Sequence, residues 1–138
     1  NLPDSACILN FHFVHFTPLH IASSIGDVTK CELLMQKKAN KNATDDTGMT
    51  PLHWATSNQN TECVEFLLNQ EADTGLRDFV GIKTSLNFVH RTPLHIAFYL
   101  ENRKIIQLLL DNHADLSIKD VSFSFFLTNL LEYGKKTK

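Results

Sequence analysis

The sequence predicts an all-α solenoid of three stacked helix-turn-helix repeats with hairpin-type loops. The first observation is a hexapeptide that recurs almost unchanged, as Thr-Pro-Leu-His-Ile-Ala from Thr17, Thr-Pro-Leu-His-Trp-Ala from Thr50 and Thr-Pro-Leu-His-Ile-Ala from Thr92. The second is its spacing, which is 33 residues (50 − 17) and then 42 residues (92 − 50). The third is an amphipathic segment after each copy. Self-similarity at such a period indicates units that bury their apolar faces by stacking on one another.

Each hexapeptide specifies the start of a helix. The threonine hydroxyl can cap the first turn, and the proline suits that turn because its missing N–H would be unbonded there anyway. We expect first helices from Pro18 to the break at Gly26, from Pro51 to about Ser57 and from Pro93 to Leu100.

A second helix follows in each unit. Val28, Cys31 and Leu34 recur on one face of a segment at 28–37. The equivalent segments are 61–69, with Thr61 as the expected cap, and 103–111.

The hexapeptide and the 33-residue period together resemble the ankyrin repeat family, whose signature is Thr-Pro-Leu-His-x-Ala. On this resemblance the repeats occupy residues 17–49, 50–91 and 92–120. An irregular flank precedes them at 1–16, and an apolar segment, a candidate capping helix, follows at 121–138.

The chain departs from the family pattern where helices end. The family usually has a left-handed glycine before the alanine that closes each repeat, and this chain has Lys38, Glu71 and His113 there. Each departure costs about 1 kcal/mol, so we expect a less stable array. Gln59 and Glu101 likewise replace the glycine kept at Gly26.

The second spacing exceeds the first by nine residues. The extra residues, about Lys83 to Arg91, fall where the family has a hairpin loop, so we expect a longer finger on the surface.

Composition narrows the class of partner. A hydrophobic content of 43% and a formal net charge of -2 give no reason to expect binding to nucleic acid. No apolar run reaches the ~18 residues of a membrane span, so we expect no membrane insertion. Three cysteines, an odd number without close pairs, argue against a disulfide framework. We therefore expect a monomer in a reducing intracellular compartment, the cytoplasm or the nucleus.

The sequence offers no catalytic, cofactor or metal site. The family resemblance implies that His20, His53 and His95, at one equivalent position of three units, hold helix starts by hydrogen bonds. Phosphate-loop, nucleophile-elbow and zinc-protease motifs are all missing, so we expect no enzyme activity. A metal hypothesis rests on Cys7, His12, His15 and His90, whose spacing matches no zinc pattern. We expect Trp54, Cys31 and Cys63 to be core residues.

The resemblance implies binding of another protein through the concave face and the hairpin tips. The residues expected to contribute are Asp46, Thr47, Met49, Ser57, Asn58, Tyr99 and Leu100. Tyr99 and Leu100 form an apolar pair that either anchors a partner or only covers the edge of repeat three.

Two alternatives stay open. Because the sequence opens on Asn1 and not on methionine, the chain fits a regulatory or targeting fragment of a larger enzyme, channel or ubiquitin-ligase adaptor. It also fits a nonfunctional fragment from an imperfect gene model. A solenoid fixes the mode of binding and not the partner.

Overall fold

The computed structural model describes residues 15–79, 91–116 and 132. Within these ranges the chain forms six helices in three pairs and no strand, so the all-α prediction is confirmed. The helices are α2 (Pro18–Ile25), α3 (Val28–Gln36), α4 (Pro51–Ser57), α5 (Thr61–Asn69), α6 (Pro93–Tyr99) and α7 (Arg103–Asp111). The predicted boundaries agree with these to within one residue.

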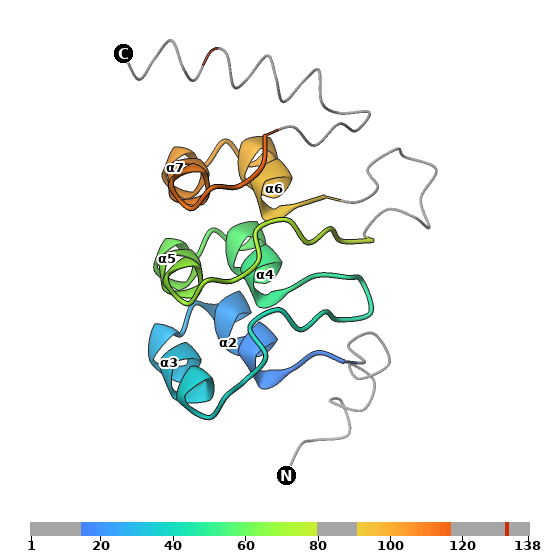
Figure 1. The fold of residues 1–138 in the computed structure, drawn as a ribbon, viewed down its shortest axis with the longest axis vertical. Helices are drawn as coiled ribbons and strands as arrows, with labels where there is room; N and C mark the ends of the chain where they lie inside the picture. Colours follow the sequence, from blue (N-terminus) through green and yellow to red (C-terminus); the bar gives the residue numbers. More distant parts are fainter. Residues whose placement is uncertain (1–14, 80–90, 117–131, 133–138) are drawn as a thin grey trace.

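The three pairs stack in a single row (Figure 1). The first helices pack in the order α2, α4, α6 and the second helices in the order α3, α5, α7, while the helices of each pair also contact one another. The loops between pairs project to one side of the row. One hydrophobic core therefore runs through the stack, with fully buried side chains such as Leu19, Leu52, Leu67 and Leu109.

The first helices begin where the hexapeptide predicts. In α4, Thr50 Oγ1 accepts a hydrogen bond from His53 N (3.3 Å), and His53 Nδ1 accepts one from Thr50 N (3.1 Å). The same reciprocal capping box begins α2 and α6. Each box satisfies N–H groups that have no partner within the helix.

The second helices begin differently. Asp27 caps α3 and Asn102 caps α7, each through a side-chain oxygen that accepts from a backbone N–H. The prediction that Thr61 caps α5 is wrong, because Thr61 is the first helical residue and Asn60 is the N-cap. Asn60 gives no side-chain cap, since its Nδ2 instead donates to the carbonyls of Ser23 and Ser24 in repeat one (both 2.8 Å).

The helix ends confirm the expected left-handed residues. Gly26 has a φ of 82°, and Gln59 and Glu101 adopt 57° and 55° at the equivalent positions. Lys38, Glu71 and His113 have values of 62°, 60° and 64°. The backbone of this fold therefore imposes φ > 0 whether or not the sequence supplies glycine.

The same backbone bond joins the ends of the loop between α3 and α4 and the described ends of the loop between α5 and α6. Asp45 N donates to Met49 O (3.1 Å), and Asp78 N donates to Arg91 O (2.9 Å). Arg91 is therefore part of the repeat, and the insertion expected at about Lys83 to Arg91 ends before it. The rest of that insertion, the flank at 1–14 and the candidate capping helix at 121–138 (apart from residue 132) lie outside the described residues.

Candidate functional site

The repeated histidines use both ring nitrogens. Nδ1 of His20 and of His53 accepts a hydrogen bond from a threonine N–H, so the proton of the neutral ring is on Nε2. His20 Nε2 donates to Met49 O (2.9 Å) and His53 Nε2 donates to Arg91 O (3.0 Å). Burial lowers the pKa of both imidazoles, because it disfavours the charged form. Each ring ties a helix start to the following hairpin and has no nitrogen left for proton transfer.

Asp45 organises the first hairpin. Its Oδ1 accepts from Thr47 N (2.9 Å), Thr47 Oγ1 (2.6 Å) and Met49 N (3.0 Å). Its Oδ2 accepts from Trp54 Nε1 (2.7 Å). No role for Asp45 was predicted from the sequence. The recurrence of aspartate at residue 78, 33 residues later, is the signal that could have identified it.

The three predicted tip residues differ in exposure. The Met49 side chain is only 5% exposed, so the prediction that it lies on the surface is wrong. Its position is fixed because its N–H and C=O are bonded to Asp45 and His20. Thr47 is half-buried, whereas Asp46 is exposed and lies 2.7 Å from His15 Nδ1.

The second hairpin carries an aromatic that the sequence reasoning missed. Phe79 is 50% exposed, and its N–H donates to Thr47 O (2.6 Å). Its ring lies over Gly48, where an added Cβ would be 2.6 Å from a ring carbon, and Gly48 has a φ of 73°. The two hairpins are thereby joined, with Phe79 on the outside.

The first-helix surface changes along the stack. Asn58 is exposed, but its Nδ2 donates to Ser24 O (2.8 Å) and Ser24 Oγ (2.9 Å), which links α4 to α2. Ser57 and Leu100 are half-buried. Tyr99 is 67% exposed, the most exposed large hydrophobic side chain of the described residues.

The described residues supply no group of three or more side chains that could hold a metal ion. Cys7, His12 and His90 of the metal hypothesis lie outside these residues, and His15 is paired with Asp46. Cys31 and Cys63 are buried as expected, whereas Trp54, also expected in the core, is half-buried. A hydrogen bond to Cys31 and burial both raise the pKa of the Cys63 thiol.

In the described ranges, no helix is long and apolar enough to cross a membrane.

Comparison with known proteins decides the family. A sequence model described as ankyrin repeats, in three copies, matches residues 19–120. The chain belongs to the ankyrin repeat family. Ankyrin repeats in general mediate protein–protein interaction and are typically noncatalytic.

Several curated relatives share part of this ankyrin array. Mouse Rabankyrin-5 is 37% identical over 67 residues, which is 48% of this chain and 6% of the relative. The Drosophila melanogaster ARF GTPase-activating protein Git is 40% identical over 57 residues, 41% of this chain and 8% of the relative. Rat ankyrin repeat and SAM domain-containing protein 6 is 44% identical over 62 residues, 44% of this chain and 7% of the relative. The chain thus spans less than a tenth of the length of each.

Proposed function

We propose that this chain is a noncatalytic recognition module that binds a partner protein through its first-helix face and hairpin tips. The exposure of Tyr99 carries the proposal. Single exposed apolar residues are normal on protein surfaces, but Tyr99 occupies the position that Ser24 and Ser57 hold in the preceding repeats. A large rigid ring at a position that elsewhere takes serine has the properties of an interface anchor.

The surface around Tyr99 supports a partner that contacts more than one repeat. In repeat two the face is polar, with Ser57 and an Asn58 amide already bonded to Ser24. Towards the C-terminus it becomes apolar at Tyr99 and Leu100. A partner with both a polar and an apolar segment fits this gradient, and exposed Phe79 and Asp46 extend the surface to the hairpin tips.

The bonding of the repeated histidines supports a noncatalytic role. His20 and His53 have both ring nitrogens bonded within the fold, and Asp45 is surrounded by donors. A general base must be within hydrogen-bond reach of a substrate proton, and none of these groups is exposed to one.

The test replaces Tyr99 by a photoreactive phenylalanine analogue in cells and, separately, replaces Glu65, which is exposed on the second helix α5. We expect a discrete crosslinked protein from position 99 and none from position 65. With that protein purified, Tyr99→Ala should weaken binding at least about tenfold, because truncating an anchor costs ~2 kcal/mol. Ser57→Ala should leave the affinity within about twofold.

Two results would contradict the proposal. The first is equal crosslinking from positions 99 and 65. The second is unfolding of Tyr99→Ala, seen by circular dichroism, which would make Tyr99 a core residue.

A second candidate is that the module serves a larger polypeptide as a regulatory or targeting segment. The small share of each relative that the chain spans favours it. The mass of the endogenous protein, measured with an antibody against residues 17–120, would distinguish the two. We also propose a reducing compartment, the cytoplasm or nucleus, which accords with the free thiols of Cys31 and Cys63.

A further inference from the structure

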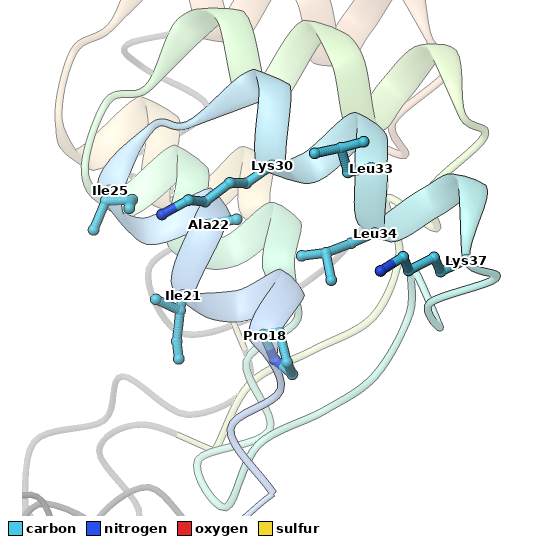
Figure 2. Close-up of a pocket in the computed structure, with 8 residues that line it drawn as sticks. All are labelled: Pro18, Ile21, Ala22, Ile25, Lys30, Leu33, Leu34 and Lys37. Carbon is cyan, nitrogen blue, oxygen red and sulfur yellow. The ribbon is translucent and has the colours of Figure 1, made fainter. Parts of the chain in front are cut away.

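The outer face of repeat one carries an apolar groove between α2 and α3. It has a volume of about 330 Å³, and Ile21, Ile25, Leu33 and Leu34 supply apolar side chains to it. Ile21, Ile25 and Leu33 are 49%, 62% and 51% exposed. Figure 2 shows these side chains on the two helices, with Lys30 and Lys37 beside them. The groove is therefore an accessible apolar surface bordered by two cations.

The internal repeats indicate what shape of ligand the groove receives. Leu34 corresponds to Leu67 in repeat two and to Leu109 in repeat three, and both of these are 0% exposed. They are buried because a preceding helix pair packs over the same face, α3 on α5 and α5 on α7. The groove of repeat one is thus the one copy of this helix-binding face that no helix covers among the described residues.

Charge distinguishes this copy from the other two. Lys30 occupies the position of Cys63 and Ile105, which are 0% exposed. Its side chain is 65% exposed, and its ammonium is 3.8 Å from the Asp27 carboxylate. Lys37 forms no ion pair with any described residue.

These lysines exclude two occupants. A further repeat like those of this chain would bury both lysines against apolar side chains, and burying the Lys37 ammonium, which forms no ion pair with any described residue, costs several kcal/mol. Two copies of this face packed together would bring like charges together, which is also unfavourable.

We propose that this groove binds an amphipathic α-helix of a partner protein that carries carboxylates beside its apolar stripe. The apolar side chains fill the space between Ile21 and Leu33, and two carboxylates beside the apolar stripe pair with Lys30 in α3 and with Lys37 at its C-terminal end. This is recognition of a helix in a groove, with charge selecting the partner. It adds a second surface, which does not include Tyr99.

The test uses the full 138-residue chain and a fluorescein-labelled helical peptide of about 18 residues, with leucines at helical spacing flanked by glutamates. The matched control peptide has lysine in place of each glutamate. By fluorescence anisotropy we expect the acidic peptide to bind at least about tenfold more tightly than the basic one. In the Lys30→Glu, Lys37→Glu double variant the preference should reverse.

Three controls test whether the double variant is still folded and whether the peptides bind at the groove and not at Tyr99. Both lysines are exposed, so circular dichroism should show an unchanged fold in the double variant. Ile21→Ser should weaken both peptides, and Tyr99→Ala should weaken neither. Failure of the acidic peptide to bind, a preference unchanged by charge reversal, or loss of binding in Tyr99→Ala would each overturn the inference, whatever the outcome of the crosslinking experiment at position 99.

Discussion

Asp45 and Asp78 occupy the same position of two successive repeats, and each is buried with donors around both carboxylate oxygens. In both, Oδ1 accepts from the backbone N–H of the residue at the other end of the hairpin, Met49 or Arg91. The donors to Oδ2 differ. Trp54 Nε1 supplies the bond to Asp45. The Ile96 side chain at the equivalent place has no donor, and the Arg91 guanidinium supplies two bonds to Asp78 (2.9 and 2.7 Å). Both buried carboxylates therefore have hydrogen-bond donors at each oxygen, although different residues supply the donors to Oδ2.

Acidification should destabilise the fold through its buried histidines. The pKa values of His20 and His53 are lowered from the ordinary value of 6.5. Below pH 6.5 the unfolded chain therefore binds more protons than the native one, so the free energy of unfolding is highest above this pH and decreases below it. Each group can contribute up to about 1.4 kcal/mol per pH unit. Urea unfolding followed by Trp54 fluorescence at about pH 7.5 and about pH 5.5 measures this.

The control for the pH experiment is His53→Ala. We expect it to be less stable by about 1 to 3 kcal/mol at the higher pH, since it leaves the Thr50 N–H without its partner and removes one of the two hydrogen bonds that the Arg91 carbonyl accepts. Its stability should depend less steeply on pH. An equally steep dependence would show that His53 does not titrate between the two states.

Replacing a left-handed residue by glycine should stabilise the protein. Glu71 is exposed with a φ of 60°, so Glu71→Gly relieves backbone strain without losing packing. We expect a gain of about 0.5 to 1 kcal/mol in thermal or urea unfolding. Glu65→Gly, at an exposed site inside α5, should instead lose about 1 kcal/mol. If both variants lost stability, the strain at Glu71 would be negligible.

At the scale of the helices, features with local causes could be predicted from the sequence. The Thr-Pro-Leu-His capping box specifies the first helix starts, and these were correct. Features that depend on a distant segment could not be predicted. Asn60 gives α5 no side-chain cap because its amide bonds to repeat one, Met49 is buried where its carbonyl accepts from His20 of α2, and Phe79 gains its role from Gly48.

In the candidate site, too, features with local causes could be predicted from the sequence and features that depend on distant segments could not. The sequence indicated the exposed Tyr99, because it stands where other repeats have serine. The groove on repeat one depends on which faces of the stack are covered, and the hexapeptide does not determine that. The sequence feature that indicates an uncovered face is Lys30, which stands where the other two repeats have the apolar residues Cys63 and Ile105.

Shortening the second loop should leave the helices intact. Removing residues 82–90 joins Gly81 to Arg91, so that Asp-Phe-Val-Gly-Arg-Thr replaces the loop, in the pattern of Asp-Asp-Thr-Gly-Met-Thr from Asp45. The closing bond and the Asp78–Arg91 ion pair are kept. We expect an unchanged or higher melting temperature, because a shorter loop is closed at a lower entropic cost. A deletion that extends through Arg91 should destabilise the protein, and an unfolded 82–90 variant would show that the removed residues are part of the core.

At the scale of the whole molecule, stability comes from the interfaces between helix pairs. Helices of seven to nine residues are marginal in water on their own. The pair α4 and α5 has a neighbour on each side, and fully buried side chains such as Leu52 and Leu67 belong to it. Three repeats are about the minimum for such an array, so both outer helix pairs depend on their contacts with α4 and α5.

A cavity in the middle repeat should therefore unfold the molecule as one unit. Leu67 is 0% exposed in α5, which contacts both α3 and α7, so Leu67→Ala should cost about 2 to 5 kcal/mol. Leu34→Ala, at the equivalent but half-buried position of repeat one, should cost less. Trp54 fluorescence reports on repeat two and far-ultraviolet circular dichroism on all helices, and we expect both to give the same urea midpoint in each variant. If fluorescence changed at a lower urea concentration than circular dichroism, the repeats would be unfolding separately, and the outer pairs would have to be stable without their neighbour.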